Sequence, residues 1–404
     1  MADQPRGILT YQGIPVWRHA VLIQWALQII SAIAVVTLVV WFFSNVAFAI
    51  NDRDIPFGWN FFGRSYGTPV PEHALPFNDS TDSYAYALLV AAVNTIILAV
   101  AGVILAIIVG TLIGIARLSP NWLLSRLSLV YVEFFRNVPL LVQLLFIFYF
   151  ILVLPPITET YNLFDVLYIN NAGIAMPQPT LSSGIAPGLG WVAAAGAGVF
   201  LGYTVYKLRN RREIVTGAVS YPLLTGIGTA VGIAAVAWVA IWAMAGDTPL
   251  GLSIPAPDDR FGRIEDGLRV RSGAIVMLVG LVMYTAAFIA EIVRAGIQSV
   301  SRGQTEAALA VGLKPVGVLR NVTFPQALRV IIPPLISQCL NLTKNSSLAP
   351  AVGFADLTNV GITMTQTAPA INIFLVIMLA YLAMSLAWSA VGNFYNWRTR
   401  IVGT

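Results

Sequence analysis

A run of polar residues interrupts an apolar segment near the C-terminus of this chain. The run comprises Asn341, Thr343, Lys344, Asn345, Ser346 and Ser347. It follows Pro333 and Pro334, which remove backbone donors, kink a helix and free carbonyls that need partners. A lysine inside a membrane is costly unless it faces a partner or a wet cavity. The run therefore either lines a path for a polar solute or joins helices, with Lys344 paired to Glu291 or Asp356 or reaching the membrane surface.

A second polar segment, residues 299–326, connects two apolar runs, and roughly 30 residues is long for a connection without a role. Ser301 is a candidate helix N-cap, and the residues after it favour a helix. Gly312 permits a left-handed turn, and Pro325 is expected to end a second helix. We expect a short helix–turn–helix across the membrane face that exposes Glu306 to a soluble partner. The alternative is an ordinary connecting loop.

Two carboxylate–arginine pairs are each spaced three residues apart, Glu291 with Arg294 and Glu133 with Arg136. Such spacing places both members on one helical face. Each pair is either part of an inner gate or docking platform, or an interfacial ion pair worth roughly a few tenths of a kcal/mol. Asn94 is a lone polar residue in an apolar segment, which favours a hydrogen bond to a neighbouring helix.

Two motifs for enzymatic chemistry are absent from the sequence. It contains no Gly-x-x-x-x-Gly-Lys-Ser/Thr loop for nucleotide phosphates and no His-Glu-x-x-His zinc motif. The two histidines, His19 and His73, lie in different segments, and the single Cys339 cannot form a disulfide within the chain. We therefore expect no enzyme activity, no metal and no cofactor in this chain.

The elements that position these residues are apolar segments. The chain is 57% hydrophobic and 10% charged, whereas soluble domains are roughly a quarter charged. Eight segments are candidate membrane spans: 21–43, 86–116, 127–154, 191–206, 219–245, 272–293, 330–349 and 371–397. The fold class is therefore an all-α polytopic membrane protein with about eight transmembrane helices.

Three of these segments need comment. Segment 21–43 is longer than the ~7–15 apolar residues of a signal peptide, so we expect a retained helix. Segment 127–154 is too long for one straight span, so about its first ten residues are expected to lie along the interface before Pro139. Segment 191–206 is short and has to extend back toward Gly188.

Lysine and arginine are distributed unequally between alternate loops. With the N-terminus inside, the cytoplasmic cations are Arg6, Arg18, Arg117, Arg126, Lys207, Arg209, Arg211, Arg212, Arg294, Arg302, Lys314, Arg320, Arg329, Arg398 and Arg400. The outer loops hold Arg53, Arg64, Arg260, Arg263, Arg269 and Arg271, accompanied by many carboxylates. The positive-inside rule then predicts that both termini and loop 299–326 are cytoplasmic. The cations flank apolar runs, so membrane lipid and not nucleic acid is the expected contact.

The spacing of Glu306-Ala307-Ala308, Gly312 and Pro325 resembles the EAA loop of ABC-importer permeases, where the ATPase subunit pushes on the transmembrane subunit. The resemblance implies an ATPase-coupling site. Its residues would be Gln304, Glu306, Ala307, Ala308, Gly312 and Pro325. Further stretches look like the polar amino acid subgroup of these permeases: 131–143 (YVEFFRNVPLLVQ), 285–300, 325–336 and 340–349. The similarity covers about 84–156 and 272–402.

The departure from the usual pattern is informative. In a typical member the two similar blocks are nearly contiguous and form a five-helix core. Here two extra spans intervene and one precedes the core, a layout similar to the larger permeases of general L-amino acid importers, the Aap and Bzt type, and within it the Q-like (BztB-like) subunit. The expected domains are 1–83, 84–156, 157–271 and 272–404, with the coupling loop at about 299–326.

The resemblance implies a type I ABC-importer transmembrane domain in a bacterial inner membrane. The expected partners are a homologous second permease (a heterodimer), two copies of an ABC ATPase that bind ATP and Mg, and a periplasmic amino-acid-binding protein. The cargo would be polar or general L-amino acids such as glutamate, glutamine and aspartate. The alternatives are a secondary transporter driven by an ion gradient, in which a docking loop would have no purpose, and a non-transporting membrane scaffold.

Overall fold

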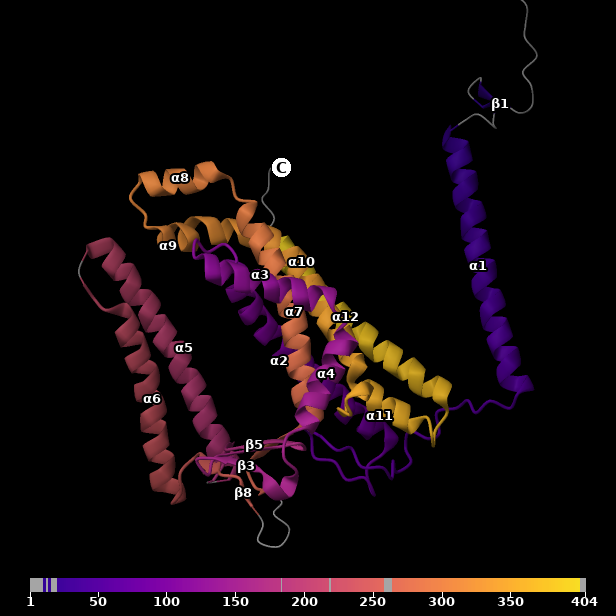
Figure 1. The fold of residues 1–404 in the computed structure, drawn as a ribbon, viewed down its shortest axis with the longest axis horizontal. Coiled ribbons are helices and arrows are strands. Elements are labelled where there is room, and N and C mark those ends of the chain that lie inside the picture. The colour runs from indigo at the N-terminus through magenta and orange to yellow at the C-terminus, as the bar shows by residue number, and fades with distance from the viewer. Residues whose placement is uncertain are drawn as a thin grey trace, which may run out of the picture.

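The computed structural model describes residues 10–11, 14–15, 20–182, 184–217, 219–257 and 264–399. Arg6, Arg18, His19, Arg260, Arg263 and Arg400, named above, lie outside these residues. The fold is mostly helical, as expected, and its long helices run between two ends of the molecule (Figure 1). They are α1 (Ala20–Asp52), α2 (Tyr84–Ala116), α5 (Ile185–Thr216), α6 (Pro222–Ala245), α7 (Ser272–Gln298), α10 (Phe324–Asn345) and α12 (Ala370–Thr399).

Within the described residues, six of these helices are long and apolar enough to cross a membrane, namely all except α10. The polar run and the two prolines lower the hydropathy of α10, which otherwise occupies the position of a predicted span. A bent pair, α3 (Trp122–Asn137) and α4 (Leu140–Leu152), would make a seventh span and turns by 106°. The break lies at Pro139, where the sequence predicted it.

Gln143 stabilises the break between α3 and α4. Its Nε2 donates to the carbonyl of Phe135 at 2.9 Å and to that of Val138 at 2.8 Å. Proline at 139 has no N–H to donate, and the bend leaves carbonyls at the end of α3 without helical partners. One buried amide therefore satisfies two orphan carbonyls, which explains why a polar residue is retained in an apolar helix.

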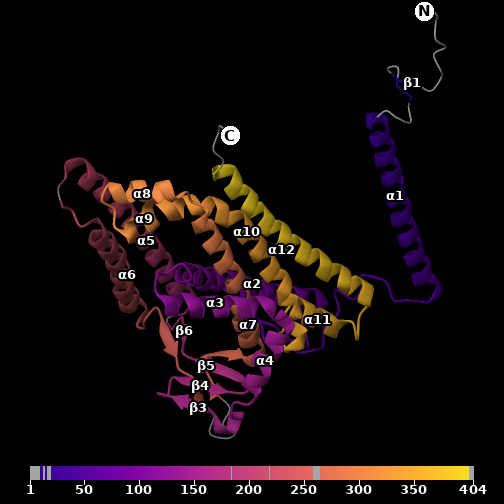
Figure 2. The same cartoon turned by 45° about the horizontal axis from the view of Figure 1, so that its top comes forward.

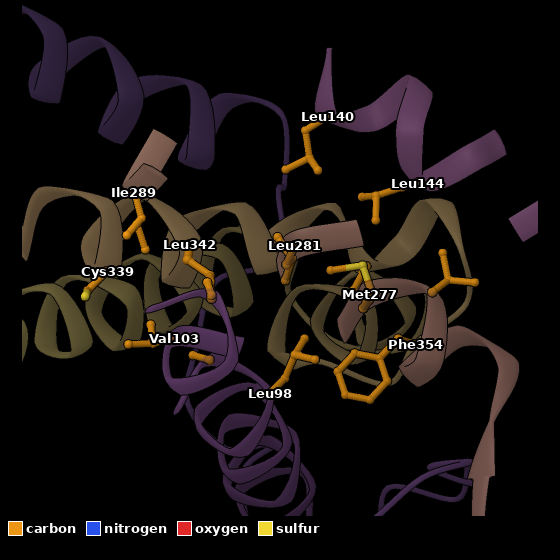
Figure 3. Close-up of a cluster of buried hydrophobic side chains, with 14 of the residues drawn as sticks. Leu98, Val103, Leu140, Leu144, Met277, Leu281, Ile289, Cys339, Leu342 and Phe354 are labelled. Atoms are coloured by element: carbon orange, nitrogen blue, oxygen red, sulfur yellow. The ribbon is translucent and has the colours of Figure 1, made fainter. Parts of the chain in front are cut away.

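Helices α2, α4, α7 and α10 surround one apolar core (Figure 3). Its members include Leu98, Val103, Leu140, Leu144, Met277, Leu281, Ile289, Cys339, Leu342 and Phe354. Helix α2 packs closely on α7 because glycines face it: a Cβ on Gly114 would lie 2.7 Å from the carbonyl oxygen of Ala290, and one on Gly110 would lie 2.8 Å from that of Ala286.

We expect the Gly114→Ala substitution to destabilise the protein by about 1–3 kcal/mol, because the added methyl group meets rigid backbone and forces α2 away from α7. The unfolding temperature in detergent would measure this. Gly232→Ala is the matched control, since nothing lies within 4 Å of a Cβ at that position of α6. A Gly114→Ala protein as stable as the Gly232→Ala protein would contradict the close packing.

The loop between α1 and α2 folds under one end of the core. Asn94 of α2 secures it: its Nδ2 donates to the carbonyls of Glu72 (2.7 Å) and Ala355 (2.9 Å), and its Oδ1 accepts from the N–H of Ala74 (3.2 Å). Its partners are therefore loop backbones and not the neighbouring helix that the sequence favoured. The Glu72 carboxylate accepts from the N–H of Ala355 at 3.1 Å, so this loop and the segment before α11 (Leu357–Met364) are joined twice.

Burial raises the pKa of Glu72 above its ordinary value of 4.5, although the bond from Ala355 and the charge of Arg271 lower it. Because the folded-state pKa is raised, the contribution of Glu72 to stability is present below pH 4.5 and is lost as the pH rises through the folded-state pKa. We expect Glu72→Gln to remove this dependence and to unfold at a higher temperature than the natural protein at neutral pH, but not near pH 4. Asp79→Asn, an exposed change in the same loop, should leave the pH profile of the unfolding temperature unchanged.

The segment between the two blocks of the core contains short strands that the sequence did not predict, followed by a helical hairpin. Strands β3 (Tyr161–Leu163), β4 (Leu167–Asn170), β5 (Gly173–Met176) and β10 (Leu268–Arg271) form an antiparallel sheet in the order β10-β5-β4-β3. Smaller pairs are β6 (Gln178–Thr180) with β7 (Gly251–Ser253), and β8 (Ala256–Pro257) with β9 (Ile264–Glu265). These strands lie below α7, at the end of the molecule opposite α8 (Arg302–Ala310) (Figure 2).

Helices α5 and α6 pack on each other through glycine. A Cβ on Gly202 would lie 2.5 Å from the carbonyl oxygen of Gly226, and the Trp191 indole donates to the carbonyl of Ala234 at 3.0 Å. Helix α5 begins at Ile185, so the short predicted segment does extend back past Gly188. The hairpin stands beside the core, and α1, in which no residue is buried, stands apart on the other side (Figure 1).

Candidate functional site

The loop after α7 forms a helix–turn–helix, as the sequence predicted. Helix α8 (Arg302–Ala310) ends in a Schellman motif: the N–H of Leu313 bonds to the carbonyl of Ala308 at 3.2 Å, and that of Gly312 bonds to Leu309 at 2.9 Å. Gly312 has φ +88°, the left-handed conformation that glycine adopts without strain. Ser301 occupies the N-cap position, but its side chain makes no capping hydrogen bond.

The second half of this loop differs from the prediction. Helix α9 (Pro315–Val318) continues through a π-helical turn, η3 (Leu319–Thr323), directly into α10. Pro325 therefore does not end a helix but lies in the first turn of α10, where its missing N–H costs little. The wider π turn precedes the proline, and the N–H of Phe324 bonds to the carbonyl of Leu319. A rigid connection thus leads from the turn at Gly312 into the core helix.

Among the described residues, no element covers the surface of α8 and the turn that faces away from the core. Gln304, Glu306 and Ala307 are exposed, whereas Ala308 is buried against the molecule. Val311 and Val316 are 79% and 77% exposed, next to these polar residues. Exposed apolar side chains beside a charged one are typical of protein-interaction surfaces. The Gln326 side chain also donates to Gln304 at 3.3 Å, which ties α8 to the start of α10.

Glu291 connects α2 and α7 just before the loop. Its carboxylate accepts from Arg117, the C-cap of α2, and from Arg294, and Arg294 also donates to Gln298 at the last turn of α7. Within the described residues these are the only ion pairs. The predicted Glu291–Arg294 pair therefore exists, but it belongs to a three-residue network that holds the C-terminal ends of α2 and α7 together. Glu291 is engaged by arginines and is not a partner of Lys344.

The second predicted pair does not form. Glu133 accepts from the Asn137 side chain at 3.2 Å, and the Arg136 guanidinium lies over the ring of Phe288, 5.3 Å from its centroid. Among the described residues no ion pair joins Glu133 to Arg136. An aromatic face replaces the carboxylate because α3 lies against α7 at this point, so the arginine contacts the adjacent helix instead of its own.

The structure divides the polar run, which spans the end of α10 and the start of the 3₁₀ helix η4 (Ser346–Ala351), into two groups. Thr343 and Ser346 are buried: Thr343 donates to the carbonyl of Cys339 (3.0 Å) and accepts from the Trp388 indole (2.9 Å), and Ser346 donates to the carbonyl of Thr343 (2.7 Å). Both residues therefore form hydrogen bonds to the backbone of α10, and Thr343 also links α10 to α12 through the Trp388 indole. Asn341 and Lys344 are exposed, and Asn345 and Ser347 are partly buried.

The exposed polar side chains lie on one face of α10. Ser337, Asn341 and Lys344 follow at intervals of four and three residues and are all exposed. Lys344 makes no hydrogen bond or ion pair with the described part of the chain. Asp356, its other proposed partner, accepts from the Tyr381 hydroxyl (3.0 Å) and the N–H of Asn359 (2.7 Å). This polar face is free for a partner or a wet cavity.

Several connecting residues had no sequence signal strong enough to identify their partners. Three such contacts join positions that only the fold brings together. They are the hydrogen bonds of Asn94, the hydrogen bond from the Tyr381 hydroxyl to Asp356, and the two hydrogen bonds of the Gln143 amide. A lone polar residue in an apolar segment was the available signal, and it marked Asn94. Among the described residues no group of three or more His, Cys, Asp or Glu lies close enough to hold a metal ion.

A helical membrane domain with an exposed loop helix and a polar helix face is typical of one class of protein, the transmembrane component of a transport system. Residues 102–401 match the family described as the binding-protein-dependent transport system inner membrane component. This chain belongs to that family, whose members are transport components without enzyme activity of their own.

Three known proteins are similar to the chain. The general L-amino acid transport system permease protein AapQ of Rhizobium johnstonii is 39% identical, over 93% of this chain and 92% of its own. The glutamate/glutamine/aspartate/asparagine transport system permease protein BztB of Rhodobacter capsulatus is 35% identical, over 92% of each. The glutamate/aspartate import permease protein GltJ of Escherichia coli K12 is 39% identical, but over 30% of this chain and 50% of its own. The first two alignments extend over nearly the whole chain, whereas the third covers less than a third of it.

Proposed function

We propose that this chain is a permease subunit of an ATP-driven importer of polar L-amino acids in a bacterial inner membrane. The names of its full-length relatives, AapQ and BztB, support a general amino-acid specificity that includes glutamate, glutamine and aspartate. The chain would pair with a homologous second permease and rest on two ATPase subunits, which bind ATP and Mg. A periplasmic amino-acid-binding protein would deliver the substrate to its outer surface.

One observation carries this proposal: the exposed face of α8 and the Gly312 turn. It displays Glu306 between exposed apolar side chains, and its two ends continue into α7 and α10. A force applied to α8 therefore reaches two core helices without an intervening flexible loop. Such a connection suits a subunit that is moved by an ATPase, whereas a carrier driven by an ion gradient would have no use for it.

The charge distribution supports a cytoplasmic position of this loop. Helices α8 and α9, the end of α2 near Arg117, and the turn between α5 and α6 lie at the same end of the molecule (Figure 1). Strands β3 to β10 and α11 lie at the other end. The end with α8 carries most of the lysines and arginines, so we infer that it faces the cytoplasm and that both termini do as well.

The mechanism follows from these connections. When two ATPase subunits close on ATP, the α8 helices of the two permeases would be drawn together. The Glu291–Arg117–Arg294 network keeps α2 and α7 moving as one body. Helix α10 moves with the turn, and its polar face with Asn341 and Lys344 would change from an inward-facing to an outward-facing position. The chain makes and breaks no covalent bond.

The direct test is a tagged purification from the native membrane, with the associated subunits identified. ATP hydrolysis would be measured with and without L-amino acids plus periplasmic extract. We expect an associated ATPase that this mixture stimulates. A chain that purifies without any ATPase, under detergent conditions that preserve known complexes, would favour a gradient-driven carrier or a scaffold.

A further inference from the structure

The inner end of the α5–α6 hairpin carries cations that the proposed import mechanism does not use. The cations are Lys207, Arg209, Arg211 and Arg212, near the end of α5. Arg209 is engaged by the turn: its Nη1 donates to the carbonyl of Ser220 at 3.2 Å, and the Ser220 hydroxyl donates back to the carbonyl of Arg209 at 3.3 Å. The other three are exposed, and their charged groups form no ion pair or hydrogen bond within the described residues.

Helix geometry places these cations at the depth of lipid headgroups. From Ile185 to Tyr206, α5 covers about 33 Å at 1.5 Å per residue, close to the ~30 Å hydrocarbon core of a bilayer. Lys207 directly follows this part of α5 and is therefore the first residue beyond the hydrocarbon core. The rings of Tyr203 and Tyr206 lie 6.4 Å apart at the same level, and tyrosine is enriched where the hydrocarbon meets the headgroups.

No carboxylate of the hairpin neutralises the cluster. Glu213 is the single acidic residue between 207 and 221, and it accepts from the Ser220 hydroxyl at 3.1 Å. The two helices pack on each other, and their inner end projects beside the core, where no element of the described residues covers it (Figures 1 and 2). Three unpaired positive charges therefore face whatever surrounds the end of the hairpin.

We propose that Lys207, Arg211 and Arg212 bind the phosphates of anionic phospholipids and so anchor the inner end of the α5–α6 hairpin in the headgroup layer. Cations directly next to a transmembrane helix attract anionic lipid, each by about fivefold in association. Lys207 and Arg211 are four residues apart and share a helix face. The guanidinium groups offer paired donors that match phosphate oxygens.

An acidic surface on the ATPase is the competing occupant, because the hairpin end lies next to α8 and α9 in both views (Figures 1 and 2). The depth of the cluster favours lipid: the cations begin at the end of the apolar length and not beyond the headgroup layer. The inference requires that α5 and α6 cross the membrane, which their length and composition allow. It does not require transport activity.

The test uses the full chain with a donor fluorophore at Val215→Cys, a position 84% exposed, while Cys339 is buried and stays unlabelled. The chain is reconstituted in phosphatidylcholine nanodiscs that contain traces of acceptor-labelled phosphatidylglycerol or phosphatidylcholine. We expect greater energy transfer to phosphatidylglycerol, and we expect high salt to reduce this preference. The triple substitution K207Q/R211Q/R212Q should remove most of the preference, whereas the charge-conserving K207R/R211K/R212K should keep it.

Equal transfer to the two lipids at low salt, or a preference that survives the neutral substitutions, would overturn the proposal. So would a neutral variant that loses the ATPase subunit in nanodiscs of phosphatidylcholine alone, since the cluster would then be a protein-docking surface. Arg209 is kept in every variant. In vesicles, an impermeant thiol reagent checks that Val215→Cys lies on the same side of the membrane in each variant. The energy-transfer measurement needs no ATPase subunit, ATP or substrate, so its result is independent of the import proposal.

Discussion

Replacing Glu306 by lysine is expected to abolish most amino-acid uptake while the chain still folds and inserts. Glu306 is exposed on α8 and contacts no other part of the described chain through an ion pair, so the change removes nothing that holds this chain together. In a docked complex, loss of a close charge contact costs about 2–5 kcal/mol. That corresponds to a fall in uptake of about 30-fold or more. Uptake of labelled glutamate by vesicles, with ATP hydrolysis measured in parallel, would show the loss of coupling.

The matched control is Glu159→Lys, the same change of charge at an exposed position on the opposite end of the molecule. Because it lies away from α8, it should leave the association with the ATPase and the basal ATP hydrolysis unchanged. A second variant tests the geometry: Gly312→Val places a β-branched residue at φ +88°, which the left-handed region does not accommodate. Gly312→Asn is tolerated there and should retain much of the activity. Normal uptake by Glu306→Lys or Gly312→Val would show that the loop does not dock an ATPase.

The sequence predicted those parts of the fold that depend on local pattern. The helices, the break at Pro139 and the left-handed turn at Gly312 follow from hydropathy and from the backbone limits of proline and glycine. Pro325 was misplaced because a proline in the first turn of a helix and one just after a helix look alike in sequence. The π turn before it, which joins α9 to α10, has no sequence signature.

Contacts between residues that are distant in sequence were harder to predict than the locations of helices and turns. The three-residue spacing identified Glu291 and Arg294 correctly, but the same spacing failed for Arg136 because Phe288 of another helix was the better contact. Arg117 joins Glu291 from 174 positions away, so no local rule could find it. The strands between α4 and α7 were missed because each has two to four residues, too few for an alternating pattern.

For the polar run, residue type alone did not predict which side chains are buried and which are exposed. Six polar residues suggested either a solute pathway or a contact between helices, and burial separates them into a structural pair, Thr343 and Ser346, and an exposed face with Asn341 and Lys344. A helix of 3.6 residues per turn must divide such a run between faces. The exposed group is the one that remains for a substrate, and the pairings of Lys344 considered from the sequence are excluded because both carboxylates have other partners.

Lys344→Met is therefore expected to weaken import without weakening the fold. The methionine has a similar length but no charge, and Lys344 has no hydrogen-bond or ion-pair partner among the described residues. Its one structural contribution is a cation at the C-terminal turn of α10, worth about 0.3–1 kcal/mol. If Lys344 contacts a substrate carboxylate on the pathway, loss of a hydrogen bond to a charged group costs about 1.5–3 kcal/mol. Uptake at low substrate concentration would then fall by about 10- to 100-fold.

Thr343→Val is the matched control, one position away but buried. It breaks the bonds to Cys339 and Trp388 and leaves the indole N–H without an acceptor, so it should lower the unfolding temperature and change the substrate dependence little. Opposite behaviour of the two variants separates the pathway from the helix contact. If Lys344→Met instead lowers the stability of the assembled complex and leaves uptake unchanged, the lysine is a contact to the second permease, because a charge at this depth needs some partner.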